Sequence, residues 1–385
     1  MIKSGSTPSG VLFFMGSFGI ISIVKEEMTM NGKSDKTKIK SITFEELEAF
    51  VESLGGKKFR AKQVFEWMHK GVRSFEEMSN LPKSLREALE EKADPEALVT
   101  ETVQVSKKDG TRKYLFRLSD GQFVESVLMK YSYGNTVCIS TQAGCRMGCA
   151  FCASCEGGLI RDLTAGEILD QVLAVSRDIG QKVDHVVVMG VGEPFDNYEN
   201  LARFLRNIHD ERGFGMSFRS ITVSTCGILP KIRQFADDFP QVTLAISLHA
   251  SNEQIRAKLM PVDRTYPYED LLETAREYVK KTNKRITFEY ILIDGVNDST
   301  RQAEELARQL RGLLCHINLI PFNEVLGRGF SSAKPERVRL FQEALQQKGY
   351  EVTVRRELGS DIDGACGQLR AKKNEQGAGS WKQEA

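Results

Sequence analysis

Residues 144–152 read GCRMGCAFC, and this stretch decides how the rest of the chain is interpreted. It places Cys145, Cys149 and Cys152 in a C-x3-C-x2-C array directly after an apolar, strand-like run at residues 135–141. Three thiolates this close repel one another unless they share a cation, and soft thiolate ligands favour zinc, copper(I) or an iron–sulfur cluster. A structural zinc site is closed by four ligands, whereas three ligands leave a position open for a substrate. The array therefore predicts a metal centre with an open position.

The spacing of the array, with Phe151 before the last cysteine, closely resembles the signature of the radical S-adenosylmethionine (SAM) superfamily. The resemblance implies that Cys145, Cys149 and Cys152 hold one [4Fe–4S] cluster, whose fourth iron binds the amino and carboxylate groups of SAM. An alternative starts from Cys155, which follows Cys152 with C-x2-C spacing and would allow a closed four-cysteine zinc site. The residues downstream favour SAM binding over a small zinc module.

The composition is that of an ordinary globular protein, with 41% hydrophobic and 27% charged residues among 385. A length prior of roughly 150 residues per domain suggests two or three domains. The net charge of +1 argues neither for nor against nucleic acid, so RNA binding would need a local basic patch. Eight cysteines are too few for a disulfide scaffold, and their clustering favours a reducing, cytoplasmic location.

Residues 10–24 (GVLFFMGSFGIISIV) form an apolar run of 15 residues near the N-terminus. The run is shorter than the roughly 20 residues needed to span a bilayer, and no small-residue cleavage pattern follows it. We therefore expect no membrane association, and we hypothesise that translation starts at Met28 or Met30. Peptides from residues 1–24 in mass spectra of the native protein would contradict that hypothesis.

The sequence pattern divides the chain into five segments. Residues 1–41 are an apolar and basic N-terminal extension, expected to be disordered or to reflect a misassigned start. Residues 42–97 have helical periodicity, which predicts a small helical accessory domain; the family resemblance described below implies that it binds RNA. Residues 98–134 alternate in the manner of strands and form a β extension, residues 135–360 form the core barrel, and residues 361–385 form a cysteine-bearing loop and a polar tail.

A basic stretch in the accessory domain is the reason for expecting RNA there. Between residues 57 and 73 six basic side chains accompany one acid, Glu66. Such a surface suits contacts to RNA phosphates, although a solvated helix face has the same composition. The six residues are Lys57, Lys58, Arg60, Lys62, Lys70 and Arg73.

After the cysteine array, short apolar runs alternate with longer helical patterns. The expected strands are 185–189, 220–224, 242–247, 286–293 and 317–320, and the expected helices include 165–175, 271–280 and 303–310. With the strand that leads into the array, these make six βα units, which implies parallel pairing and right-handed crossovers. The predicted fold class is α/β: a partial (β/α)6 radical-SAM barrel with a small N-terminal helical domain and a β extension. Chemistry in such a barrel sits at the carboxyl ends of the strands.

Polar residues follow several of these strands at their carboxyl ends. The segment MGVGEP at residues 189–194 combines glycines, which let backbone approach a ligand, with a carboxylate that can accept from an ammonium group. Gly192 and Glu193 resemble the GEP motif that binds the SAM amino group. Helix capping or turn chemistry would explain each of the polar residues at the remaining strand ends if it were taken singly. Polar groups at four strand ends that face one ligand are a less ordinary coincidence. The resemblance assigns contacts with the SAM carboxylate, ribose and adenine to Ser224, Ser247, Leu248, His249 and Asn323.

Two further cysteines determine the expected reaction. Cys138 lies on the strand before the array, and Cys366 lies in the loop GSDIDGACGQLRAK; each alone would be read as a small buried hydrophobe. Together with the GCRxGCxFC, MGxGEP, SLHA, LIPxN and DIDxACGQLR motifs, they resemble the radical-SAM RNA adenine methyltransferases over residues 42–373. Cys155 and Cys226 are departures from that pattern; Cys226 is expected to be structural, and Cys155 stands where the pattern has a small residue other than cysteine.

The resemblance implies a mechanism with two SAM molecules per methylation. The first methylates Cys366, and the second is cleaved to a 5′-deoxyadenosyl radical that takes hydrogen from that methyl group. The resulting methylene radical adds to C2 of adenine and gives a covalent RNA–enzyme adduct. Cys138 then removes the C2 proton and releases the product by forming a transient disulfide with Cys366. Glu125, in FVESVLMK, matches the acid/base carboxylate of the family.

The resembled family acts on C2 of adenine 2503 in 23S rRNA and on adenine 37 of certain tRNAs. The implied partners are therefore these RNAs, in a form whose adenine can leave its stack, and an electron donor such as flavodoxin or ferredoxin; a monomer is expected. One alternative is a sister enzyme that methylates C8 of the same adenine and confers antibiotic resistance, although the loops LIPFN and GACGQLRAKK look more like the C2 enzyme. A non-enzymatic zinc- or cluster-bearing RNA-binding protein would leave Glu193 and Cys366 unexplained.

Overall fold

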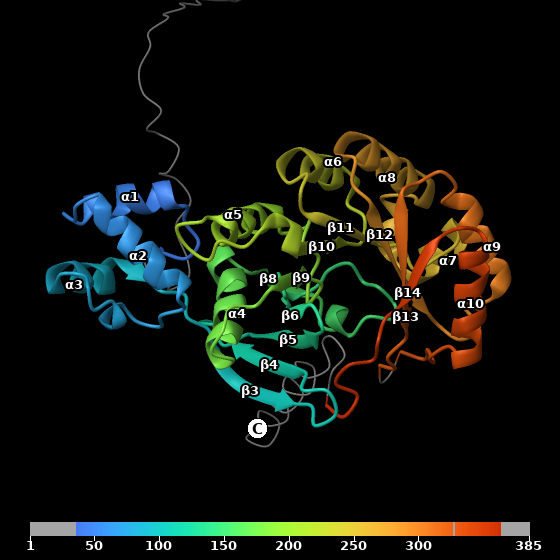
Figure 1. Ribbon diagram of the computed structural model, residues 1–385, viewed down its shortest axis with the longest axis horizontal. Helices are drawn as coiled ribbons and strands as arrows, with labels where there is room; N and C mark the ends of the chain where they lie inside the picture. Colours follow the sequence, from blue (N-terminus) through green and yellow to red (C-terminus); the bar gives the residue numbers. More distant parts are fainter. Residues whose placement is uncertain (1–35, 326–327, 363–385) are drawn as a thin grey trace, which may run out of the picture. The chain divides into compact units, whose positions relative to one another are not determined.

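The fold is built on one large, open sheet, which the computed structural model describes within residues 36–325 and 328–362 (Figure 1). In these residues seven parallel and three antiparallel strands form a ten-stranded sheet whose two edge strands do not pair with each other. The parallel strands follow one another across the sheet in chain order, so every crossover advances by one strand. They are β6 (Gly134–Cys138), β9 (His185–Val188), β10 (Ile221–Thr225), β11 (Thr243–Ser247), β12 (Ile286–Leu292), β13 (Cys315–Pro321) and β14 (Glu351–Val354).

Crossovers of one hand that always advance by one strand place the connecting helices on the same face of the sheet. Neighbouring helices pack in pairs along it: α4 beside α5, α6 beside α8, and α9 beside α10. The helices are α4 (Ala165–Asp178), α5 (Tyr198–His209), α6 (Leu229–Asp238), α7 (Glu253–Leu259), α8 (Tyr268–Thr282), α9 (Thr300–Gln309) and α10 (Pro335–Gln347). This arrangement confirms the predicted open βα barrel.

The helix starts are encoded locally. Thr164 and Ser299 each cap a helix, α4 and α9, by accepting from the backbone N–H three residues on, while Glu167 and Gln302 return a bond to the cap backbone. Such capping boxes satisfy two N–H groups that a helix end otherwise leaves unpaired. In β9, β10 and β13, buried residues alternate with residues that are mostly half-buried, so one face of the sheet packs under the helices and the other is partly open.

One strand of the barrel was missed by the sequence analysis. β14 follows α10 and pairs in parallel with β13 at the edge of the sheet. Its sequence, EVTV, is only four residues long and buries Val352 alone, so it offers too few positions for a period to be recognised. The barrel therefore has seven parallel strands within the described residues, rather than the six that were expected.

The β extension continues the same sheet. β3 (Val99–Val105), β4 (Arg112–Arg117) and β5 (Phe123–Tyr131) pair antiparallel with one another, and β5 pairs antiparallel with β6. Tyr114, Phe116, Val124 and Leu128 join the core of the barrel. The extension is thus a lateral continuation of the barrel wall.

The N-terminal helical segment has a hydrophobic core of its own, formed by residues from Ile39 to Ala93. Its helices are α1 (Phe44–Ser53), α2 (Phe59–His69) and α3 (Lys83–Lys92), with a short 3₁₀-helix, η1 (Phe75–Glu77). The two-residue strands β1 (Thr37–Lys38) and β2 (Ala93–Asp94) pair in parallel and tie the start of this segment to its end. That strand pair is too short to have been anticipated from the sequence.

Short elements complete the description. β7 (Gln142–Gly144) and β8 (Leu159–Asp162) form an antiparallel ladder at the base of the cysteine loop, which contains the 3₁₀-helix η2 (Ala153–Cys155). Two further 3₁₀-helices are η3 (Phe218–Ser220) and η4 (Pro261–Arg264). The apolar run at residues 10–24 and Cys366 lie outside the described residues. Within the described ranges, no helix combines the length and apolar character that crossing a membrane requires.

Candidate active site

The cysteine loop is closed by a backbone contact that only glycine permits. Gly144 has φ +86°, and a Cβ on it would lie 2.0 Å from the carbonyl oxygen of Gly158. The next residue, Cys145, donates its backbone N–H to that same carbonyl at 3.1 Å. Farther along the loop the Ala150 N–H bonds to the Leu259 carbonyl at 2.9 Å. The loop is therefore pinned at its base and at its tip, which fixes the three thiols relative to the barrel.

The three cysteines of the array line one cavity, of about 180 Å³, at the carboxyl ends of the parallel strands. We call it the thiol cavity. Of the predicted SAM-contacting residues, Gly192, Glu193, Ser224, Ser247 and His249 all line it. The structure thus brings together groups from the ends of β9, β10 and β11 that lie far apart in sequence.

Gly192 and Glu193 form one corner of the thiol cavity. Gly192 has φ +110°, and a Cβ there would lie 2.7 Å from the Gln142 Cβ. The buried Glu193 carboxylate accepts from the Thr225 hydroxyl at 2.7 Å, the Cys226 N–H at 2.7 Å and the Phe195 N–H at 3.0 Å. Burial nevertheless raises the pKa of Glu193, because the desolvation of its charge outweighs these bonds. An ammonium group in the cavity would restore the charged form.

His249 is held as a neutral imidazole. Its backbone is left-handed, with φ +58°, and its Nδ1 accepts from the Ile291 N–H at 3.1 Å, which leaves Nε2 as the protonated nitrogen. Burial, together with the positive charge of Arg256, lowers the pKa of His249 to about 3. Its ring lies edge-on to Phe151, with centroids 5.1 Å apart. The imidazole can therefore donate one hydrogen bond without carrying charge.

The remaining residues that were predicted to contact SAM lie in different places. The Ser224 and Ser247 hydroxyls, on adjacent strands, lie 3.4 Å apart and face the same cavity. Leu248 does not line the thiol cavity; its side chain is fully buried in the barrel core. Asn323 lines a second, neighbouring cavity.

Two buried ionisable residues at this site were missed by the sequence analysis. Glu289, on β12, lines the thiol cavity, accepts from the Asn318 amide at 2.8 Å, and has a pKa raised by burial. Arg256, on α7, is fully buried and donates to the carbonyls of Ser247, Leu248 and Cys226. It thereby ties the exit of β11 to that of β10. Glu289 could have been identified as a candidate because it is an acid inside the apolar run ITFEYIL. The sequence around Arg256 offers no comparable indication.

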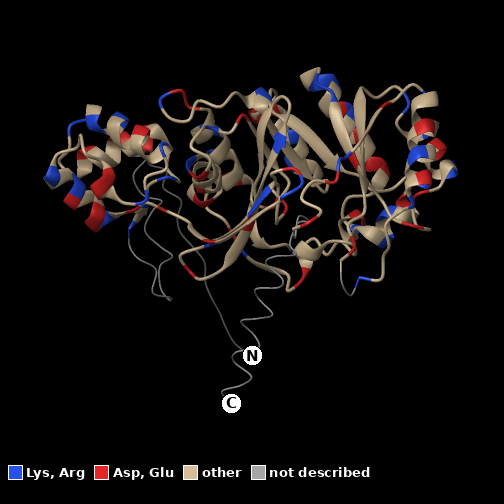
Figure 2. Ribbon diagram, turned by 60° about the horizontal axis from the view of Figure 1, so that its bottom comes forward, with Lys and Arg blue, Asp and Glu red and all other residues tan. Residues whose placement is uncertain are grey.

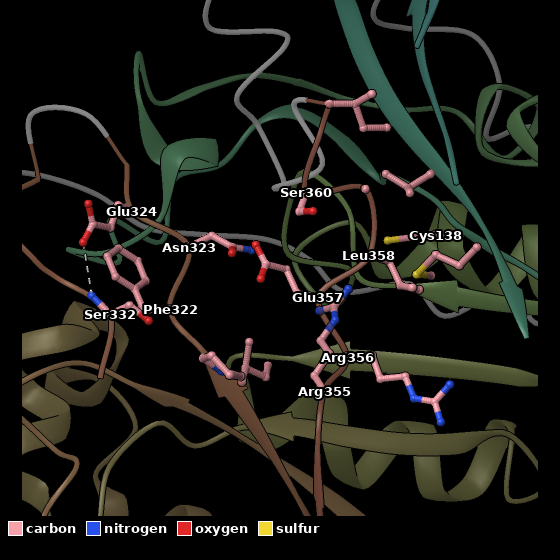
Figure 3. Close-up of a pocket in the computed structure, with 16 residues that line it drawn as sticks. Cys138, Phe322, Asn323, Glu324, Ser332, Arg355, Arg356, Glu357, Leu358 and Ser360 are labelled. Carbon is pink, nitrogen blue, oxygen red and sulfur yellow. Dashed lines mark hydrogen bonds between the residues drawn. The ribbon is translucent and has the colours of Figure 1, made fainter. Parts of the chain in front are cut away.

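The second cavity, of about 490 Å³, has Cys138 in its wall, and we call it the Cys138 cavity (Figure 3). Its lining comes from β5, β6, the exit of β13 and the segment after β14, and includes Asn323, Arg356 and Glu357. Ile320 and Arg355 line both cavities, so the two are neighbours across these side chains. The sequence analysis could not place Arg355, Arg356 and Glu357 in a cavity, because it did not recognise β14, the strand that precedes them.

Glu125 lies next to Cys138 but is engaged by a charge that the sequence analysis missed. Val127 pairs with Cys138 across β5 and β6, and Glu125, two residues from Val127, points to the same face of the sheet. Its carboxylate lies 3.1 Å from the ammonium of Lys113 on β4, and both side chains are buried. The predicted acid/base is thus part of a buried ion pair.

The donor set fits a cluster better than a single metal ion. Over the described ranges, no three His, Cys, Asp or Glu side chains are arranged to hold one metal ion. A cluster places each thiolate on its own iron, and its sulfurs need not meet at one point. Cys145, Cys149 and Cys152 line a single cavity together with Glu193 and the two serines, so the residues that would hold a cluster and SAM share one site.

Comparison with known proteins agrees with this fold. Residues 37–94 match the ribosomal RNA large subunit methyltransferase N-terminal domain, and residues 139–307 match the radical SAM superfamily. A protein of Lachnospira eligens named "Probable dual-specificity RNA methyltransferase RlmN" is 51% identical over 337 residues, which are 87% of this chain and 96% of the relative. A protein of the same name from Thermoanaerobacter sp. (strain X514) is 50% identical, over 87% of this chain and 98% of its own length.

A solved structure is similar over the same range. The crystal structure of a radical SAM methyltransferase from Sphaerobacter thermophilus has a TM-score of 0.83 and 45% sequence identity, and the match covers 86% of this chain and 98% of that one. The barrel and the accessory segment therefore occur together in proteins of one kind. This chain belongs to the RlmN family of dual-specificity RNA methyltransferases, within the radical SAM superfamily.

Proposed function

We propose that this chain methylates C2 of adenine 2503 in 23S rRNA and of adenine 37 in tRNAs, with SAM as the source of the methyl group. The observation that carries the proposal is the position of Cys138. Its thiol lies in the wall of a cavity that shares Ile320 and Arg355 with the cavity of the three cluster cysteines. A base bound in the Cys138 cavity would lie between the proposed proton acceptor and the proposed radical source.

The residues predicted to form the site have defined tasks in this proposal. Cys145, Cys149 and Cys152 would hold the [4Fe–4S] cluster, which with SAM supplies the methyl group and the 5′-deoxyadenosyl radical. Glu193 would accept a hydrogen bond from the SAM ammonium group. The contacts to the rest of SAM are assigned to Gly192, Ser224, Ser247 and His249 in the thiol cavity, and to Leu248 through its backbone and Asn323 from the neighbouring cavity.

The steps at the adenine are assigned to three side chains. Cys366, which lies outside the described residues, would carry the methyl group as S-methylcysteine. Cys138 would take the proton from C2 and then form a transient disulfide with Cys366. Glu125, on the same face of the sheet as Cys138, is assigned the acid/base role, with the Lys113 ammonium 3.1 Å from its carboxylate.

The substrate would enter as an unstacked base, because chemistry on a ring atom requires extrusion from a helix. Five of the six basic residues between positions 57 and 73 are exposed and Arg60 is half-buried, and the ribbon of this domain carries both basic and acidic residues (Figure 2). Phe59 is 57% exposed with the Arg60 guanidinium 4.7 Å from its ring centroid. We propose that this surface contacts RNA phosphates. We also propose that the enzyme is a monomer in the cytoplasm and that a flavodoxin or ferredoxin is its electron donor.

The test is anaerobic incubation of the reconstituted protein with SAM, reductant and a fragment of 23S rRNA, followed by mass spectrometry of the nucleosides. We expect 2-methyladenosine from the wild-type protein and none from Cys138→Ala or Cys366→Ala. Cys315→Ala is the matched control, because Cys315 is a buried thiol on β13 that lines neither cavity. Its product yield should equal that of the wild type.

Two outcomes would contradict the proposal. Formation of 8-methyladenosine would assign the chain to the sister reaction at C8. Absence of methylated adenosine, in a preparation that contains iron and sulfide and cleaves SAM, would show that the substrate assignment is wrong while the radical chemistry is right.

A further inference from the structure

Cys155 is a fourth thiol at the cluster site, and the proposed mechanism gives it no task. It follows Cys152 at the same spacing at which Cys152 follows Cys149, so residues 149–155 read C-x2-C-x2-C. That run is the spacing with which bacterial ferredoxins bind three irons of one cluster. The sequence around Cys155 is therefore compatible with a cluster ligand in its own right.

The backbone turns the Cys155 thiol toward the other three. Cys155 ends the 3₁₀-helix η2, its N–H points at the Cys152 carbonyl at 3.4 Å, and its own carbonyl accepts from the Gly158 N–H at 3.1 Å. Its side chain lines the same cavity as Cys145, Cys149 and Cys152. A soft donor that shares one cavity with all three predicted ligands is placed to bind the group that they would hold.

Cys155 also lies on the side of the site where SAM is expected. It lines the thiol cavity together with Glu193, Ser224 and Ser247, and it is half-buried. Three thiolates would leave one iron of a four-iron cluster without a protein ligand. In the SAM-free protein, Cys155 would then be a soft donor in the cavity where that iron would lie.

We propose that Cys155 is an exchangeable fourth ligand of the cluster, which binds the open iron when SAM is absent and leaves it when SAM binds. The proposal rests on the cluster assigned under the proposed function. The exchange involves no electron transfer: the iron–sulfur bond to Cys155 breaks, and bonds form from that iron to the amino nitrogen and a carboxylate oxygen of SAM. The proton lost by the SAM ammonium goes to solvent.

Two measurable consequences follow. A protein whose open iron is capped most of the time binds SAM more weakly, in proportion to the uncapped fraction. Cys155→Ala should therefore bind SAM more tightly, by roughly tenfold if the cap is in place nine-tenths of the time. The SAM-free cluster of the variant should also be bleached faster by oxygen, because its open iron is exposed to solvent.

The experiment compares wild type, Cys155→Ala, Cys155→Ser and the control Cys315→Ala after anaerobic reconstitution. Iron and sulfide content, the electron paramagnetic resonance spectrum of the reduced cluster with and without SAM, and the dissociation constant of SAM are measured for each. We expect SAM-free spectra of the two Cys155 variants that differ from wild type, spectra that coincide once SAM is bound, and tighter SAM binding in Cys155→Ala.

The outcomes separate this inference from the proposed function. Equal SAM-free spectra and equal SAM affinity in wild type and both variants would overturn the exchangeable ligand, even if RNA methylation is normal. Loss of the cluster from both Cys155 variants, with Cys315→Ala intact, would also overturn it, because Cys155 would then be a permanent ligand. A wild-type protein that binds zinc and no iron would overturn the proposed function itself.

Discussion

The Glu125 carboxylate and the Lys113 ammonium lie 3.1 Å apart on neighbouring strands, both withdrawn from solvent. A buried pair of this kind is weak evidence for stability, but removing one partner leaves an uncompensated charge and costs about 3–5 kcal/mol. Loss of activity in a Glu125 variant is therefore ambiguous, since it could report a lost acid/base group or a damaged β4–β5 wall. The pair itself offers a way to separate the two.

We predict that Glu125→Gln and Lys113→Met each lower the free energy of unfolding by about 3 kcal/mol, and that the double variant recovers much of that loss. If Glu125 is the acid/base, the double variant should still form no 2-methyladenosine, although its stability is restored. Urea unfolding and nucleoside mass spectrometry on the same preparations check this. Recovery of methylation together with stability would show that Glu125 is structural.

A second residue-scale prediction concerns Glu193, whose pKa is raised by burial. Only its ionised form attracts the SAM ammonium, so SAM affinity should fall by about tenfold for each pH unit below that raised pKa. Equilibrium dialysis of SAM against the cluster-loaded protein, from pH 8 downward, gives the slope. SAM would also lose its ammonium proton when its nitrogen binds the cluster, so some pH dependence remains in Glu193→Gln. Its affinity should be lower at pH 8 and should fall less steeply with pH than that of the wild type; an equal slope in both proteins would contradict the assignment.

At the scale of elements, most helices and strands could be predicted from periodicity, since amphipathic helices and strands with one buried face each impose a repeat on the sequence. The shortest elements could not be predicted in this way: β14 and the β1–β2 pair are too short to show a repeat. Strand-end residues such as Ser224 and Ser247 could be predicted to meet, because parallel strands end at one edge. The partner of Glu125 could not be predicted, because Lys113 reaches it only through the register of β4 against β5.

The packing of α2 against α5 gives a prediction about acid stability. His69 on α2 contacts the carbonyls of Phe65 and Asn207 at 3.0 and 3.2 Å. These contacts favour the charged ring, but burial outweighs them and lowers the pKa of His69 to about 4. Its ordinary value is 6.5, so between pH 6.5 and 4 the unfolded chain binds a proton that the folded chain does not.

Stability should therefore fall as the pH drops through this window, by roughly 3 kcal/mol in total from this one group. We expect urea unfolding between pH 7 and 4.5 to show a smaller loss of stability in His69→Gln than in the wild type. His249, whose pKa is lowered as well, is present in both proteins, so its contribution cancels in the difference. An equal or larger loss in His69→Gln would mean that the ring is charged in the folded state.

For the whole molecule, the helical domain is joined to the barrel by buried polar contacts. The Lys40 ammonium pairs with Asp170 of α4 at 2.5 Å with both side chains inaccessible, and the Asn207 amide of α5 bonds to the carbonyls of Lys40 and Ile42. Buried charges of this kind are costly unless their geometry is kept. RNA bound to the helical domain would therefore be held at a defined distance from the barrel, so that binding on one part can serve chemistry on the other.

This division of labour predicts that charge on the helical domain changes RNA affinity without changing the chemical step. In the variant Lys57→Glu, Lys58→Glu, Lys62→Glu, three exposed cations are reversed. We expect a higher KM for the RNA with kcat unchanged, and a slope of log affinity against log salt that is smaller by about 0.7 for each phosphate that the variant no longer neutralises.

The control reverses Lys280, Lys281 and Lys348, which are exposed on the barrel helices or just after them, and alters net charge equally. Filter binding at several salt concentrations and steady-state methylation measure the two effects; equal weakening in both variants would indicate that net charge, and not this surface, attracts the RNA.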